Sequence, residues 1–325
     1  MALAGRVVVL RALGLGDLLT SVPALRALRR AFPGHRITLC MPAGLAPLAE
    51  LTGAVDEVHE VRPLEPLGGG LRGCDVAVNL HGRGPQSHRV IEAIRPERAI
   101  AFRHPEVPWS LHGPGWVADE HEVLRWCRLL QSSGVAADPE DLHLELPGVR
   151  RDPRLTLIHP GAASRSRRWP AERFAAVARD EEARGHTVLI TGGPRERELA
   201  RRVAEMAGLR SGAVVAGGTS VLDLARLVAR AGRLVCGDTG VAHLATAFRT
   251  PSVLLFGPVP PSLWGPLDER RHVVLWAGLT GDPHGSAPDP GLLRIPVEQV
   301  LDALDELEDR PFTGAPSGAR IAHGV

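Results

Sequence analysis

RVVVLRALGLGDLLTSVPAL (residues 6–25) joins a run of aliphatic residues to a glycine-rich turn and an amphipathic stretch. The aliphatic run, residues 6–10, predicts a buried strand. Leu25, Leu28 and Phe32 share one face of the helix that should follow. A strand, a turn and a helix in this order form the repeating unit of a parallel sheet covered by helices. The segment therefore predicts an α/β fold.

The same unit recurs along the chain. Further strands are predicted at residues 36–40, 55–61, 75–80, 155–159, 187–191, 213–216, 234–236 and 252–256, and helices at 117–130 and from Pro170, Pro194, Ser220 and Thr239. A polar segment rich in Gly and Pro, residues 132–153, separates two such series. We therefore expect two Rossmann-like, doubly wound parallel-sheet domains, residues 1–150 and 151–310, that face a central cleft. Residues 257–290 should form an ordered loop region, and residues 311–325 a disordered tail.

Composition excludes several classes of function. The 38 basic and 37 acidic residues leave a net charge of +1 without long charged blocks, so no general nucleic-acid surface is expected. Every basic residue is Arg, which excludes a lysine nucleophile, a Schiff base and the Gly-Lys-Ser/Thr phosphate loop. The four cysteines lack metal-site spacing, and the first apolar run is too short for a signal peptide or a membrane span. A cytoplasmic protein is therefore expected.

The first candidate site follows the first strand. Gly14 and Gly16 allow the backbone to approach a ligand closely. A dinucleotide fingerprint fails because Leu19 replaces its third glycine and no acidic residue ends the second strand. Pro23 requires the helix to begin near Ser21 or to be kinked there. Asp17 should then lie on a glycine-flanked turn at the carboxyl edge of the sheet, either as a cap or facing the cleft.

The second candidate site is the loop from His159 to Pro170, which gathers hydroxyl and guanidinium groups on Ser164, Arg165, Ser166, Arg167 and Arg168. Guanidinium groups match phosphate oxygens with two parallel hydrogen bonds. Trp169 should anchor this loop by packing. The loop is either a grip for a diphosphate or a solvated basic segment.

The third candidate site is Asp238-Thr-Gly-Val-Ala-His243, again between a strand and a helix. Exposed amides at a helix start attract phosphate, and Thr239 and Gly240 add a hydroxyl donor and close approach. His243 lies about one turn inside the helix, where it could reach the same anion or pack. An aspartic protease is excluded, because the chain lacks a second Asp-Thr-Gly and the all-β pattern.

Two further segments carry polar groups. Ser220 and Asp223 have capping-box spacing, so capping of a helix is their default role. His81 and Arg83 follow the fourth strand and should lie on the cleft edge of the first domain. A purely structural loop histidine is the alternative for His81.

The three candidate sites, together with Thr250-Pro251 and Phe256-Gly257-Pro258, resemble glycosyltransferase family 9, the family of the lipopolysaccharide heptosyltransferases. The resemblance implies a GT-B fold, in which the last helix, residues 297–307, packs back on the first domain. It implies an inverting transfer in which Asp17 is the general base. Arg167 occupies the place of a lysine that contacts the donor diphosphate, and Asp223 the place of a glutamate that contacts the ribose. The block at 238–243 lines the diphosphate site, which places Thr239, Gly240 and His243 there.

The resemblance also implies the partners. The donor would be a nucleotide-diphosphate sugar such as ADP-heptose, and the acceptor a lipopolysaccharide core, another glycolipid, a cell-wall polymer or another glycan. Peripheral contact with the inner membrane would follow from a lipid acceptor. No cofactor and no metal are expected, since no Asp-x-Asp follows a strand. Two rivals stay open: a non-catalytic nucleotide-sugar-binding module in which Asp17 only caps, and a sugar-nucleotide epimerase on a similar fold.

Overall fold

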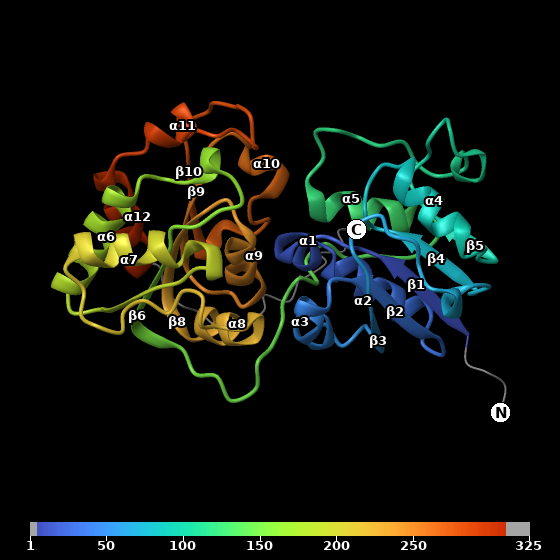
Figure 1. Cartoon of the computed structure of the whole chain (residues 1–325), viewed down its shortest axis with the longest axis horizontal. Helices are drawn as coiled ribbons and strands as arrows, with labels where there is room; N and C mark the ends of the chain where they lie inside the picture. The colour runs from blue at the N-terminus through green and yellow to red at the C-terminus, as the bar shows by residue number, and fades with distance from the viewer. Residues whose placement is uncertain (1–4, 310–325) are drawn as a thin grey trace, which may run out of the picture.

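The computed structural model describes residues 5–309 and contains two lobes, each built around a five-stranded parallel sheet (Figure 1). The first sheet has the order β3-β2-β1-β4-β5, with β1 (Arg6–Leu10), β2 (Arg36–Met41), β3 (Glu57–Glu60), β4 (Val76–Asn79) and β5 (Arg98–Ile100). The second has the order β10-β9-β8-β6-β7, with β6 (Asp152–His159), β7 (Thr187–Ile190), β8 (Ala231–Gly237), β9 (Ser252–Phe256) and β10 (His272–Trp276). Chain order reverses between β1 and β4 and between β6 and β8, where such sheets bind ligands. The predicted pair of doubly wound sheets is confirmed.

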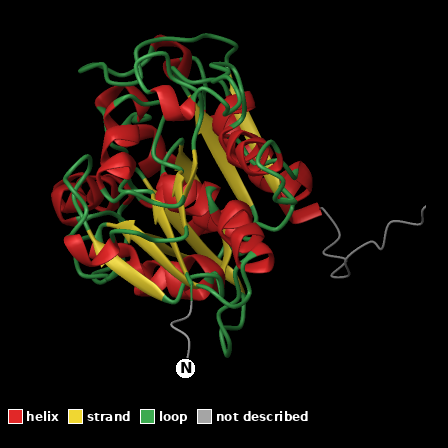
Figure 2. Ribbon diagram, turned by 90° about the vertical axis from the view of Figure 1, so that its right-hand side faces the viewer, coloured by secondary structure: helices red, strands yellow, loops and turns green. Residues whose placement is uncertain are grey.

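Helices cover both sides of the strands (Figure 2). The first lobe contains α1 (Leu15–Thr20), α2 (Val22–Ala31), α3 (Ala46–Leu51), α4 (Gln86–Ala93) and α5 (Glu122–Gln131). The second contains α6 (Ala171–Ala183), α7 (Arg197–Ala207), α8 (Val221–Arg230), α9 (Gly240–Ala247), α10 (Pro261–Trp264), α11 (Pro290–Leu293) and α12 (Val297–Asp309). None of the helices in residues 5–309 is both long enough and apolar enough to span a bilayer.

Proline divides the first helical segment as its position predicts. α1 ends at Thr20 and α2 begins at Val22, so Ser21 lies at the junction and Pro23 in the first turn of α2. Pro lacks the amide that a continuous helix would need at this point. One expectation is corrected: Asp17 is the third residue of α1 and not part of the turn that precedes it. The side chain of Asp17 therefore projects from the first turn of α1.

The strand predictions need three corrections. Residues 213–216 form only an isolated bridge between Val214 and Ile190, in a segment where Gly208, Gly212 and Gly217 have positive φ. The edge strand β5 was missed because it has only three residues. The strand β10 was missed because it lies within residues 257–290, whose Gly and Pro content predicts loop; it pairs with β9 over five residues.

The predicted position of the last helix is wrong. α12 packs against α6, β9 and β10 of the second lobe and does not return to the first. Val300, Leu304 and Leu307 are buried in the second lobe's own apolar cluster, and Arg233 pairs with Glu308 at 3.5 Å. The apolar face of α12 thus packs on the sheet of its own lobe. The predicted tail, residues 311–325, lies outside the described residues, and the division into 1–150 and 151–310 stays a prediction.

The two lobes contact each other through helices at both carboxyl edges. Residues 132–151 connect the lobes without helix or strand. α1 packs on α9, and α3 on α8 (Figure 1). One apolar cluster includes residues of both lobes, among them Leu18 and Leu19 of α1 and Val241 and Ala242 of α9. The segments that follow β1 and β8 therefore form a shared contact.

Candidate functional site

Glycines allow α1 and α9 to touch. A Cβ added at Gly16 would lie 2.8 Å from Cδ2 of His243, closer than side chains tolerate. A Cβ added at Gly240 would lie 2.9 Å from Cβ of Leu15. The first and third candidate sites, far apart in sequence, are thus brought into direct contact.

Asp17 caps α1 and remains partly open. Its Oδ2 accepts a hydrogen bond from the amide of Gly14 at 3.1 Å, and its Oδ1 lies 3.4 Å from Nη2 of Arg11. The side chain is 28% exposed. Burial raises the pKa of this carboxyl above its ordinary value, and the nearby charge of Glu122 adds to the rise, while Arg11 opposes it. Capping and proton acceptance are therefore compatible, although the sequence presented them as alternatives.

A buried arginine behind Asp17 was not identified from the sequence. Arg11 is 1% exposed and its guanidinium donates to the backbone oxygen of Asp17 at 2.9 Å and to Oε1 of Glu122 at 3.1 Å. It also donates to Thr20 and to the backbone oxygen of Leu80 at the end of β4. In the sequence, only the position of Arg11 directly after a buried strand indicated a place in the site. Glu122, on the distant α5, left no local signal.

The second and third candidate sites also meet. Nη1 of Arg167 lies 3.4 Å from Oδ2 of Asp238, and a Cβ added at Gly237 would lie 2.9 Å from the backbone oxygen of Arg167. Asp238 is buried, which raises the pKa of its carboxyl, while Arg167 lowers it. Nε of Arg167 and Oδ2 of Asp238 form no hydrogen bond within the described chain, so this ion pair keeps unused polar capacity.

Other groups of the 159–170 loop hold the loop itself. Ser164 donates to the backbone oxygen of Pro283 at 2.6 Å and lies 2.9 Å from Oγ of Ser166. Arg168 donates twice to the backbone oxygen of Ala162, at 3.0 and 2.7 Å. Trp169 is buried, as expected from its anchoring role. Of the guanidinium groups predicted for the diphosphate, Arg167 is the one beside the third candidate site.

The start of α9 is open to an anion. Thr239 is the N-cap residue in extended backbone, and its side chain does not cap the helix. The amide of Ala242 donates to the backbone oxygen of Thr239 at 3.0 Å, whereas the amides of Gly240 and Val241 make no such bond in residues 5–309 and keep donors for a ligand. This geometry agrees with the phosphate-binding interpretation of the block.

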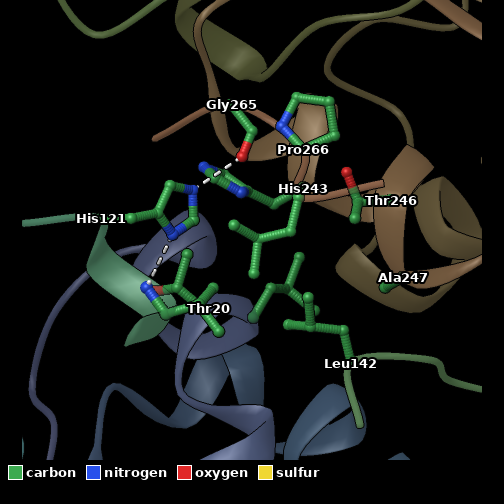
Figure 3. A pocket seen from close by; sticks show the side chains of 11 residues that line it. Thr20, His121, Leu142, His243, Thr246, Ala247, Gly265 and Pro266 are labelled. Carbon is green, nitrogen blue, oxygen red and sulfur yellow. Dashed lines mark hydrogen bonds between the residues drawn. The ribbon is translucent and has the colours of Figure 1, made fainter. Parts of the chain in front are cut away.

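His243 is half-buried and lines a small pocket between the lobes. Figure 3 shows His243 and His121 side by side in this pocket, which Thr20, Leu142 and Thr246 also line. Nε2 of His121 lies 2.8 Å from the backbone oxygen of Gly265. Burial lowers the pKa of His243 to about 4, with further lowering by His121 and Arg11. His243 is therefore neutral at neutral pH and packs the junction.

Asp223 forms the predicted capping box. Oγ of Ser220 accepts from the amide of Asp223 at 3.1 Å, and Oδ2 of Asp223 accepts from the amide of Ser220 at 3.2 Å. The Ser220 hydroxyl also donates to Oδ2 of Asp223 at 2.7 Å, and this bond, followed by that from the Ser220 amide, lowers the pKa of the exposed carboxyl. The predicted contact with a ribose would have to coexist with this cap.

His81 lies at the sheet edge near Arg11, whereas Arg83 is exposed. The amide of His81 donates to Oδ1 of Asn79 at 3.0 Å, and its buried Nδ1 has no partner in residues 5–309. Burial, together with the charge of Arg11, lowers its pKa to about 4. A neutral histidine with a free ring nitrogen thus adjoins the Asp17 region.

Comparisons with known proteins identify the family of the chain. The model of glycosyltransferase family 9 (heptosyltransferase) matches residues 118–285. Lipopolysaccharide heptosyltransferase 2 of Escherichia coli K12 is 25% identical over 342 residues, which cover 90% of this chain and 95% of that protein.

Two solved structures share the fold. That of a family 9 glycosyl transferase from Veillonella parvula has a TM-score of 0.76 and 25% identity, and covers 94% of this chain and 98% of its own. That of E. coli ADP-heptose lps heptosyltransferase II has a TM-score of 0.76 at 22% identity, over 93% and 98% of the two chains. Since the family model matches more than half of the sequence, the chain belongs to glycosyltransferase family 9 and is a glycosyltransferase of the GT-B fold.

Proposed function

We propose that this enzyme is a metal-independent, inverting transferase that moves a heptose or related sugar from an ADP-linked donor to a lipopolysaccharide core or a similar glycan. One observation carries the proposal: Asp17, a partly open carboxylate, adjoins the contact at which α1 meets the start of α9. In this proposal Asp17 would accept the proton and the start of α9 would bind phosphate, on opposite sides of one junction. The similar proteins support this donor and acceptor, because they are named lipopolysaccharide heptosyltransferase 2 and ADP-heptose lps heptosyltransferase II.

The donor diphosphate would lie on the second lobe. Arg167 supplies a guanidinium whose Nε is unused, and the hydroxyl of Thr239 and the amide of Gly240 supply neutral donors. Such groups stabilise the negative charge that grows on a departing phosphate. The ion pair with Asp238 orients the guanidinium of Arg167. Because arginine and amides supply this stabilisation, the leaving diphosphate needs no metal ion in this mechanism.

The acceptor would enter over the first lobe. Asp17 takes the proton from the acceptor hydroxyl as its oxygen attacks the anomeric carbon from the face opposite the diphosphate. The new glycosidic bond forms as the bond to the diphosphate breaks, so the configuration inverts. A carboxyl whose pKa is raised holds the proton more readily than an ordinary aspartate does. His81 and Arg83 lie on the acceptor side of this scheme, and contact with the inner membrane stays a prediction.

Replacement of Asp17 by Asn tests the proposal. The amide keeps the size and an acceptor oxygen for the cap of α1 but cannot take a proton, so turnover should fall by about a hundred- to ten-thousand-fold. Donor affinity should change little. The measurement is acceptor-dependent release of ADP from ADP-heptose, with donor affinity followed by calorimetry.

Asp56→Asn is the matched control. Asp56 also accepts from one backbone amide, that of Ile37, and pairs with one arginine, Arg29, but it lies outside the site. Its variant should keep wild-type turnover. Near-normal turnover of Asp17→Asn would remove the base and favour the non-catalytic binding module, whereas isomerised donor without transfer would favour the epimerase.

A further inference from the structure

Asp17 is one end of a buried chain of charges that continues into α5. The guanidinium of Arg11 is shared between two carboxylates: Nη2 lies 3.4 Å from Oδ1 of Asp17 and 3.1 Å from Oε1 of Glu122. Glu122 in turn lies 3.1 Å from Nε of Arg125 through its second oxygen. Charges therefore alternate along the chain from Asp17 to Arg125.

Glu122 is held firmly. It is 8% exposed, occupies the first residue of α5, and its Oε1 also accepts from the indole nitrogen of Trp126 at 2.9 Å. Trp126 stacks beneath the guanidinium of Arg11, with 4.6 Å between the guanidinium carbon and the ring centroid. A buried carboxylate of this kind is stable only with charged partners and hydrogen bonds. Glu122 has both, and one of its partners is the arginine behind the proposed base.

The geometry has two consequences for Asp17. Arg11 is fixed by Glu122 and by the ring of Trp126, so it can hold the backbone oxygen of Asp17 at 2.9 Å. Nη2 of Arg11 lies closer to Glu122 than to Asp17. The guanidinium therefore pairs more strongly with Glu122 and only partly with Asp17. An aspartate paired fully with arginine would be a weak base, because a close positive charge favours its ionised form.

We propose that Glu122 is a positioning residue of the transfer reaction: through Arg11 it fixes Asp17 and keeps the guanidinium from neutralising the base. The proposal rests on the assignment of Asp17 as the general base. It adds a residue on α5 that contacts Arg11. The charge of Glu122 also raises the pKa of Asp17, after burial as the larger cause, which agrees with the geometry.

Glu120 and Arg128 adjoin the Arg125 end of this chain, and histidines from three segments adjoin the rest of it. His81 follows β4, His121 precedes α5, and His243 belongs to α9. Burial lowers the pKa of all three, to about 4 for His81 and His243. They are therefore uncharged at neutral pH, where the charges that act on Asp17 come from Arg11 and Glu122.

The test is Glu122→Gln, which keeps the size of the side chain and an acceptor for Trp126 but removes the charge. Arg11 then pairs with Asp17 alone. We expect the acidic limb of the pH–rate profile to move to lower pH by roughly one unit, with a lower plateau. A titration of the Asp17 carboxyl by carbon-detected NMR should show the same displacement, and it separates Asp17 from the histidines.

Glu120→Gln is the matched control. Glu120 precedes α5 and makes a two-point ion pair with Arg128, at 2.6 and 2.7 Å, away from Asp17. Its loss should leave the acidic limb in place. If Glu122 serves only the fold, Glu122→Gln should lower the melting temperature like this control and leave the limb and the Asp17 titration unchanged, which overturns the proposal.

A second variant keeps the test decisive if Glu122→Gln does not fold. Arg11→Met with Glu122→Met removes both charges together, a change that buried ion pairs often tolerate. Because Arg11 acts on Asp17 more strongly than Glu122 does, the titration of Asp17 should then move to higher pH. An unchanged titration overturns the proposal. The NMR readout needs no turnover, so a failure of the proposed transferase activity would be seen separately, in the wild-type release assay.

Discussion

Gly16→Ala should loosen the contact between the lobes by a predictable amount. The new methyl would lie 2.8 Å from Cδ2 and 3.3 Å from Nε2 of His243, and 3.6 Å from Cα of Gly240. Only the two histidine atoms are too close. Overpacking of this kind costs about 1–3 kcal/mol. Alanine is favoured over glycine inside a helix by roughly 1 kcal/mol, so the net loss of stability should be about 0–2 kcal/mol.

A double-mutant cycle with His243→Ala isolates the clash. Without the imidazole, the methyl at residue 16 meets only the ordinary contact with Gly240, so Gly16→Ala should become neutral or stabilising by up to about 1 kcal/mol. The free energy of unfolding in urea, measured for the four proteins, should give a coupling of about 1–3 kcal/mol. The same cost in both backgrounds would refute the contact between α1 and α9 as the origin of the effect.

Three further predictions concern single side chains. Asp17→Asn should raise the melting temperature or leave it unchanged at neutral pH, because a carboxyl with a raised pKa is destabilising when ionised; a clear drop would speak against its burial. Arg167→Ala should weaken ADP binding in calorimetry and leave Asp238 buried without a cation, so its loss of stability should grow as pH rises through the pKa of Asp238; a pH-independent loss would contradict the ion pair. Ser220→Ala should cost about 0.5–2 kcal/mol of stability without loss of nucleotide affinity. If Asp223→Ala weakens nucleotide binding where Ser220→Ala does not, the carboxyl contacts the ligand as well as the cap.

Features set by local chemistry could be predicted from the sequence. The aliphatic run at residues 6–10 is a strand, Pro23 interrupts the helix at Ser21, and Ser220 and Asp223 form their capping box. Each depends on residues only a few positions apart, where chain geometry leaves few choices.

Features that depend on residues far apart in the sequence could not be predicted. The pattern of α12 shows an apolar face but not which lobe will cover it. Glu122 looks like an ordinary surface residue until folding buries it between Arg11 and Arg125. The short edge strand β5 lacks the length that makes a pattern recognisable. The candidate site was thus predictable as three separate motifs, while their mutual contacts and the buried charges behind Asp17 required the structure.

The contact between α1 and α9 limits how family members can be recombined. Leu15 and Gly16 on one lobe fit Gly240 and His243 on the other, with no room for an added carbon at either glycine. A chimera that takes its second lobe from another family member would bring a foreign pair of residues to this junction. Grafts that transfer all four positions together should pack without a clash, whereas grafts that cut between them would meet a steric mismatch beside the proposed general base. Exchange of donor specificity by lobe swapping should therefore begin with these four residues.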